Sequence, residues 1–240
     1  GKPVPRAAGE LSHRAKLLCT KLLLLGVVIS VLDSAPVASP SRGAVLPWLL
    51  VAELQLWAIY LWAAGCLDVG ALLVHAAGFS VEPPFDNPLL ASRSLREAWG
   101  DRWNRPVHLF LKRTVYVPVR RAGVPARLAA FCTFLASGLL HEYNFFTHNA
   151  KGYAPGEATL FFTLMGFLML AEAAASERLR ERTPPRVRAA LAATPSVAIA
   201  VALQLVVLPL FSRLFVRSWV QSGMLQAVGE LLPTLRCEYR

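Results

Sequence analysis

Residues 128–147 read LAAFCTFLASGLLHEYNFFT, and this apolar run decides the fold class. It has the length that an α-helix needs to cross the hydrocarbon core of a membrane. Four further apolar runs lie at 15–33, 44–79, 158–175 and 195–216. We therefore expect an all-α, polytopic membrane protein with about five transmembrane helices, forming a single membrane domain over residues 1–240.

The composition supports a membrane protein. Of the 240 residues, 55% are apolar and 17% are charged, and the mean hydropathy is +0.46. A soluble domain usually has about a quarter of its residues charged. The four cysteines form no CxxC pair, so we expect packed thiols and no metal site. The chain begins at Gly1 without a methionine, so we expect a processed chain or an excerpt.

The distribution of basic residues predicts the topology. The net charge is +10, and most Lys and Arg residues lie in 1–16, 80–127 and 176–194. If the long run 44–79 crosses the membrane once, all three basic segments fall on one side, as the positive-inside tendency requires. Two crossings would break that rule, so we expect one. Charge that gathers between apolar runs disfavours nucleic acid as a partner and indicates a multi-pass protein, with segment 80–127 as a basic interfacial loop or helix on the cytosolic side.

Segment 94–112 has the pattern of an amphipathic helix that lies in the headgroup layer. One predicted face is apolar and rich in indole rings, and it contains Leu95, Trp99, Trp103, Val107, Phe110 and Leu111. Basic residues back this face, and Pro106 is expected to kink the helix. One interpretation is an interfacial anchor whose arginines meet lipid phosphates. Asn104 fits that interpretation poorly, because an anchor has no use for an amide between its two faces.

The histidine-bearing helix expected over 128–149 places polar groups at bilayer depth. One face of this helix contains Phe134, Ser137, Gly138, His141, Asn144, Phe145 and His148. Leu135, Leu139 and Phe146 point elsewhere. A charged side chain at this depth costs about 2.5–3.5 kcal/mol, so an ionisable group usually faces a cavity or a partner. His141 is therefore either a neutral histidine bonded between packed helices or a base that lines a reaction chamber.

Two stretches carry a family resemblance. They are PPFDNPLLASRSLREAWGDRWNRPVHLFLKRTVYVPVR at 83–120 and FLASGLLHEYNFF at 134–146. Together they resemble the wax-synthase branch of the membrane-bound O-acyltransferases, through an F-x-N-P-L-L block, W-G-x-R-W-N, V-Y-x-P and S-G-x-x-H-E. The RWNRPVH and HEY portions are also similar to the diacylglycerol and sterol acyltransferase branch. The implied fold is a partial core of that family with an interfacial amphipathic helix.

The resemblance implies transfer of a fatty acyl group from acyl-coenzyme A to a lipid hydroxyl, on a long-chain alcohol, a diacylglycerol or a sterol. It assigns His141 and Asn104 as the reactive pair. His141 would take the proton of the acceptor, and Asn104 would orient the imidazole or donate to the oxyanion. The expected contacts to the phosphates of coenzyme A are Arg102, Arg105, Lys112 and Arg113. The implied location is the endoplasmic reticulum or another organellar membrane, with membrane lipids as partners.

Two other functions compete with this one. The chain could be an acyltransferase-like structural subunit of a larger membrane complex, with other subunits as partners and no turnover. A transporter with His141 and Glu142 as a proton relay is the third alternative, but paired carboxylates on facing spans and an inverted repeat are not visible in the sequence.

Overall fold

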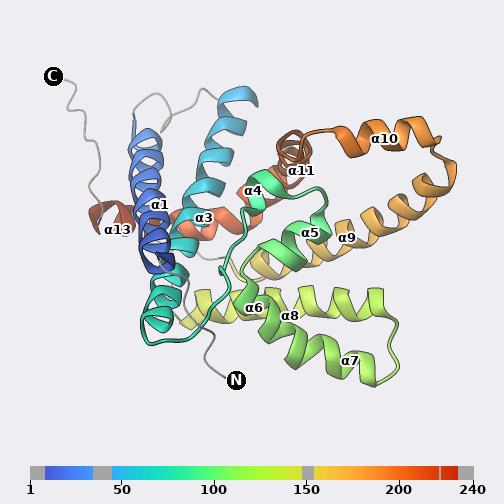
Figure 1. The fold of residues 1–240 in the computed structure, drawn as a ribbon, viewed down its shortest axis with the longest axis horizontal. Helices are drawn as coiled ribbons and strands as arrows, with labels where there is room; N and C mark the ends of the chain where they lie inside the picture. The colour runs from blue at the N-terminus through green and yellow to red at the C-terminus, as the bar shows by residue number, and fades with distance from the viewer. Residues whose placement is uncertain (1–8, 35–44, 148–153, 222, 232–240) are drawn as a thin grey trace. The chain divides into compact units, whose positions relative to one another are not determined.

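The computed structural model describes residues 9–34, 45–147, 154–221 and 223–231, and these are helical with short connections (Figure 1). Within these ranges the chain forms no β-strand, so the all-α prediction is confirmed for the part described. His148 and residue 149 of the predicted histidine-bearing span lie outside it.

The chain divides into two compact units, which are described separately here. The first comprises residues 1–84 and 216–240, and its helices are α1 (Glu10–Leu32), α3 (Val45–Ala76), α12 (Arg217–Gln221) and α13 (Met224–Leu231). The second comprises residues 85–215. Its helices are α4 (Pro88–Ala91), α5 (Leu95–Glu97), α6 (Arg105–Leu111), α7 (Val117–Arg121), α8 (Ala126–Thr147), α9 (Glu157–Arg182), α10 (Pro185–Ala193) and α11 (Ser196–Leu210), together with the π-helical turns η1 (Ala98–Arg102) and η2 (Lys112–Tyr116).

In the first unit, the long apolar run forms one continuous helix, α3, as the single-crossing prediction requires. Helix α1 packs along it and buries Leu25 and Ile29. Several other leucines and valines of α1 are exposed, including Leu23 at 64%. Exposed apolar side chains on a long helix suit a lipid environment, in which they lose nothing by facing outward.

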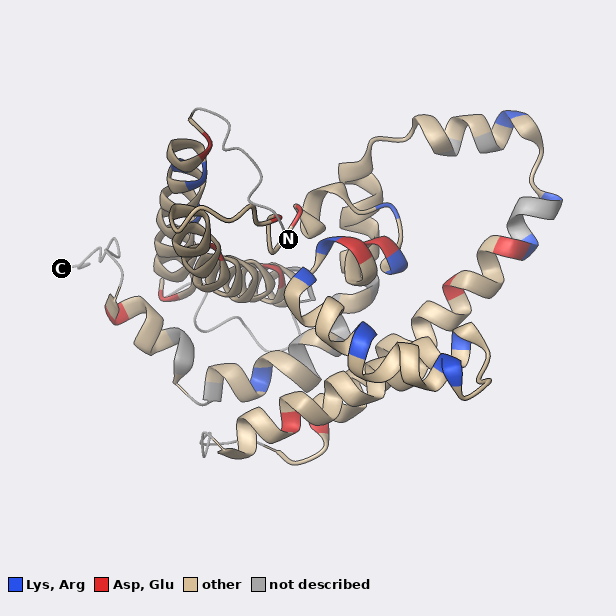
Figure 2. Ribbon diagram, turned by 60° about the horizontal axis from the view of Figure 1, so that its bottom comes forward, with Lys and Arg blue, Asp and Glu red and all other residues tan. Residues whose placement is uncertain are grey.

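Three of the described helices are long and apolar enough to cross a membrane: Glu10–Leu32, Pro47–Ala76 and Glu157–Arg178. They correspond to the first, second and fourth predicted spans. Charged residues interrupt these helices at few points (Figure 2). The other two predicted spans coincide with α8 and α11, which are helical but fall outside this group. The number of five crossings therefore stays a prediction.

The second unit is built around the antiparallel pair α8 and α9, whose backbones approach closely at two glycines. A Cβ atom on Gly138 would lie 2.8 Å from the Cα atom of Thr159. A Cβ atom on Gly166 would lie 2.8 Å from the ring of Phe131. Small residues at such crossings let helices pack by van der Waals contact, which is the main attraction available inside a membrane.

The fifth predicted span continues past α11 without leaving the helical state. Pro209 lies near the end of α11, and the π-helical turn η3 (Phe211–Val216) follows directly. Proline lacks a backbone N–H and clashes with the preceding turn, so a local change of hydrogen-bonding register is a known response. The helix therefore continues beyond Pro209 as a π turn.

Candidate active site

The predicted interfacial helix is divided in two at Trp103 and Asn104. Residues 98–102 form the π turn η1, and the backbone is extended at Trp103. Asn104 then adopts a left-handed conformation, with φ 42° and ψ 58°, and forms the N-cap of α6. Asparagine tolerates this conformation better than most residues, and its Oδ1 atom accepts a hydrogen bond from the N–H of Val107 at 3.4 Å. The interruption therefore precedes Pro106, where the sequence predicted only a kink.

Asn87 has nearly the same conformation, with φ 46° and ψ 54°, and it begins α4 just before Pro88. Hydrogen bonds join the two asparagine turns. The backbone N–H of Asp86 donates to the carbonyl of Arg102 at 3.0 Å, and the Nη1 atom of Arg102 donates to the carbonyl of Asp86 at 2.9 Å. The conformation of Asn104 is thus supported by residues from the F-x-N-P-L-L block.

Two of the four residues predicted to contact coenzyme A already form ion pairs within the chain. Arg102 pairs with Glu97 at 2.7 Å and with Asp86 at 3.2 Å, and Arg105 reaches the same Asp86 carboxylate at 3.2 Å. Burial raises the pKa of Glu97, but the backbone N–H of Arg93 and the Arg102 guanidinium outweigh this and hold it below its usual value. Both arginines therefore stabilise the loop around Asn104.

Lys112 and Arg113, the other two predicted contacts, lie on η2 and are exposed. Within the described residues neither side chain has a hydrogen bond or an ion pair, so both are available to a phosphate group. His108 lies one turn before Lys112. Burial lowers the pKa of His108, and the neighbouring Lys112 charge lowers it further.

His141 lies on α8, and most of its predicted face is confirmed. Ser137, Gly138 and Phe145 are buried, as expected, while Leu139 and Phe146 are exposed at 57% and 74%. Asn144 differs from the prediction, because it is exposed. The buried face packs against α9, which explains why burial follows the 3- and 4-residue spacing.

The hydrogen bond of His141 fixes which of its nitrogens carries the proton. Its Nδ1 atom lies 2.8 Å from the carbonyl oxygen of Ser137. A carbonyl can only accept, so Nδ1 is the donor, and Nε2 of the neutral ring keeps its lone pair. The ring stacks on Phe162 at 4.5 Å and meets the edge of Phe215 at 5.2 Å. This arrangement places the imidazole among aromatic side chains, with Nε2 as the nitrogen that could accept a proton.

Aromatic contacts connect the two predicted reactive residues. Trp99 of η1 packs on Phe162 at 6.1 Å, and Phe162 is the ring on which His141 stacks. Trp99 also contacts Trp103 at 5.4 Å, and Asn104 is the next residue. The structure therefore brings the tryptophan block and the histidine onto one phenylalanine of α9.

Two carboxylates hold this arrangement: Glu142, which the sequence suggested only as part of a proton relay, and Glu172, which the sequence analysis missed. Glu142 accepts hydrogen bonds from the N–H groups of Gly156 and Thr159, at 3.1 and 2.9 Å, and so caps the start of α9. Glu172 accepts from the N–H groups at the start of α5. In the sequence, each of these carboxylates lies inside or beside an apolar run. A charged group there is costly without a partner, and this could have indicated that each one has a bonding role.

The comparisons agree with the resemblance seen in the sequence. Residues 81–164 match the sequence model of the membrane bound O-acyl transferase family. The chain is 39% identical over 111 residues to the probable long-chain-alcohol O-fatty-acyltransferase 7 of Arabidopsis thaliana, covering 43% of this chain and 32% of that protein. It is 32% identical over 201 residues to the probable long-chain-alcohol O-fatty-acyltransferase 1 of the same plant, covering 77% and 54%. The predicted resemblance is confirmed, and the chain spans between about a third and about half the length of these relatives.

Proposed function

We propose that this chain, a relative of the membrane-bound O-acyltransferases through residues 81–164, transfers a fatty acyl group from acyl-coenzyme A to a long-chain alcohol. The observation that carries the proposal is the half-buried imidazole of His141, held through Nδ1 with Nε2 left as the acceptor. Diacylglycerol and sterols are further candidate acceptors. The proposed setting is the endoplasmic reticulum or another organellar membrane.

His141 acts as the general base. Its Nε2 atom accepts the proton of the alcohol hydroxyl while the oxygen attacks the thioester carbonyl. The carbon–sulfur bond then breaks, the ester leaves, and the coenzyme A thiolate takes the proton from the imidazolium. The Phe162 and Phe215 rings cover part of the imidazole, and limiting the access of water to the base would favour transfer to an alcohol over hydrolysis of the thioester.

Asn104 stabilises the tetrahedral intermediate. Its Oδ1 atom accepts from the N–H of Val107, so its NH₂ group points away from the helix start with two donors. Within the described residues these donors have no partner. One such donor to a developing oxyanion is worth roughly 2.7–4 kcal/mol in other acyl-transfer sites.

The phosphates of coenzyme A are proposed to contact Lys112 and Arg113, which are exposed and uncommitted in the described part of the chain. Arg102 and Arg105 also belong to the proposed set, but each would share its charge with Asp86. We therefore expect charge reversal at Lys112 or Arg113 to raise the KM for acyl-coenzyme A more than it lowers kcat.

Purified protein tests the function with palmitoyl-coenzyme A and hexadecanol, diacylglycerol or a sterol, with ester formation as the readout. We expect His141→Ala to lower the rate by about 10²–10⁴-fold, the usual contribution of a general base. His13→Ala, a histidine that is exposed on α1, is the matched control and should leave the rate unchanged. Folded protein that forms no ester with any acceptor, or a fully active His141→Ala variant, would refute the proposal.

A further inference from the structure

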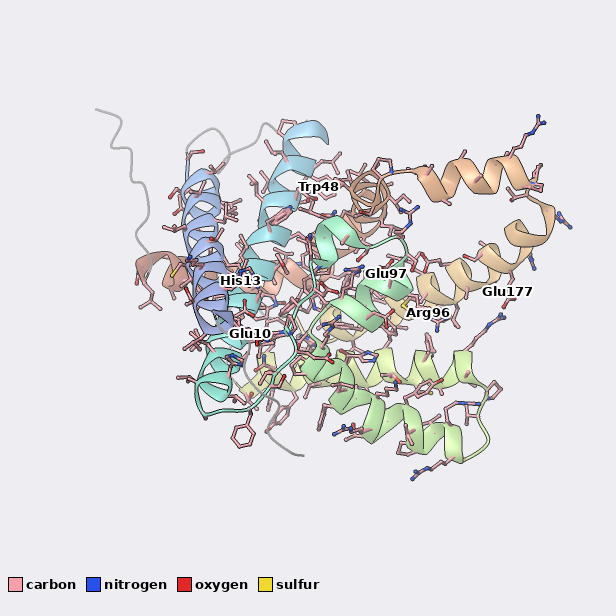
Figure 3. The ribbon with its side chains drawn as sticks, viewed as in Figure 1. Glu10, His13, Trp48, Arg96, Glu97 and Glu177 are labelled. Carbon is pink, nitrogen blue, oxygen red and sulfur yellow. The ribbon has the colours of Figure 1, made fainter. Side chains whose placement is uncertain are left out.

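Glu172 makes an unusual contact for a residue near an apolar run. Its two carboxylate oxygens accept hydrogen bonds from the backbone N–H groups of Leu95 and Arg96, at 2.8 and 3.1 Å. These N–H groups begin the short helix α5, where no intrahelical carbonyl can reach them. The Ser94 hydroxyl accepts from the N–H of Glu97 at 2.9 Å, so the start of α5 has a second cap from its own sequence. Figure 3 shows Arg96 and Glu97 at this position.

The segment that Glu172 anchors leads directly to the proposed oxyanion donor. The π turn η1 follows α5, and its Trp99 packs on Phe161 and Phe162 of α9, at 6.3 and 6.1 Å. Helix α9 therefore holds the segment at two points, through the Glu172 carboxylate and through these rings. After the second point only four residues remain before Asn104 is reached.

The same helix also positions the proposed base. Phe162 stacks on the imidazole of His141, and the start of α9 is fixed by Glu142, the residue after His141. Phe162 and Glu172 are ten residues apart on one helix, which is about 15 Å along its axis. A rigid helix of this length can therefore fix the positions of both proposed reactive side chains relative to each other.

We propose that Glu172 is a positioning residue, which fixes Asn104 relative to His141 through α5 and η1. The inference rests on the proposed function, because it assigns Glu172 a part in the same reaction. Two neighbouring N–H groups need two acceptor oxygens, and a carboxylate supplies both. Glutamine cannot replace glutamate fully, because its NH₂ group would face one of the two N–H donors. A small displacement of a reacting group is enough to slow an enzyme considerably.

A double-mutant cycle tests whether Glu172 acts through Asn104. We expect Glu172→Gln to lower kcat about tenfold, with an unchanged KM for palmitoyl-coenzyme A and an unchanged pH profile of kcat. The double variant Glu172→Gln/Asn104→Ala should be no slower than Asn104→Ala alone, because a positioning residue has no effect without its target. Glu177→Gln, five residues further along α9 at an exposed carboxylate that pairs with Arg127, is the matched control and should retain full activity.

Two outcomes would overturn the inference. If the losses of the single variants multiply in the double variant, Glu172 acts independently of Asn104. If amide hydrogen exchange over residues 95–104 is the same in Glu172→Gln as in the parent protein, the carboxylate does not hold this segment; we expect faster exchange there and unchanged exchange over 134–146. Failure of the parent protein to form ester would overturn the proposed function and this inference together, whereas multiplying losses in an active protein overturn the inference alone.

Discussion

The helix pair α1–α3 and the helix pair α8–α9 differ in how their polar side chains are paired. In the first pair, the ammonium group of Lys21 pairs with the carboxylate of Asp68 across the helix contact, and both side chains are mostly buried. In the second pair, the carboxylate of Glu142 bonds to backbone N–H groups, and His141 bonds to a carbonyl of its own helix. The first pair neutralises its charges, and the second keeps an imidazole nitrogen without a protein partner in the described residues.

This difference distinguishes a polar contact that only stabilises helix packing from a polar group that could take part in proton transfer. A buried charge pair stabilises a helix contact only while both partners are present. A neutral imidazole whose Nδ1 is engaged and whose Nε2 is open can still exchange a proton. Both pairs contain ionisable groups in apolar helices, so the presence of such groups alone does not identify an active site. The two helix pairs differ in which of their polar atoms have partners, and this difference makes His141 the candidate.

The largest expected effect comes from breaking the charge pair in α1–α3. Asp68→Leu leaves the Lys21 ammonium without its partner among apolar side chains, and we expect the free energy of unfolding to fall by about 3 kcal/mol. Reversible unfolding in mixed micelles measures this. The double variant Lys21→Leu/Asp68→Leu should lie within about 1 kcal/mol of the parent protein, because apolar replacement of both partners removes the desolvation cost. A double variant as unstable as the single one would show that the pair itself stabilises the contact.

The close approach of α8 and α9 gives the next effect. Gly138→Ala places a methyl group against the backbone of Thr159, which cannot move without shifting α9, so we expect a loss of about 2 kcal/mol. Gly70→Ala on α3 is the matched control. A Cβ atom there meets no atom within 4 Å, and we expect a gain of about 0.5–1 kcal/mol from the helix propensity of alanine. Equal effects of the two substitutions on the unfolding free energy would contradict the packing described for α8 and α9.

The smallest effect concerns the carboxylate that caps α9. Glu142→Gln keeps one acceptor and loses the charge, and we expect the free energy of unfolding to fall by about 1 kcal/mol. Faster amide exchange at Gly156 and Thr159 would locate the loss at the start of α9. Glu230→Gln, on the exposed face of α13, should change neither quantity. If both variants behave alike, the cap contributes nothing and the glycine contact alone fixes α9.

Sequence patterns predicted much of the helical framework. Apolar length predicted α1, α3 and α9, charge distribution predicted that 44–79 is one helix, and the 3- and 4-residue spacing predicted which side of α8 is buried. The resemblance assigned His141 and Asn104 as the reactive pair, and this assignment stays a prediction. These features depend on residues close together in the chain, where helix geometry relates spacing to direction.

The tertiary structure alone decided how the polar groups are used. The pairing of Arg102 with Asp86 joins residues 16 apart, and the capping of α5 by Glu172 joins residues 77 apart. The physical reason is that a helix start has unpaired N–H groups which any nearby acceptor can satisfy, and local sequence does not say which acceptor the fold brings there. The sequence thus predicted where the helices and the candidate reactive residues lie along the chain, and the packing of α9 against α8 and α5 decided how the segments that carry them are held.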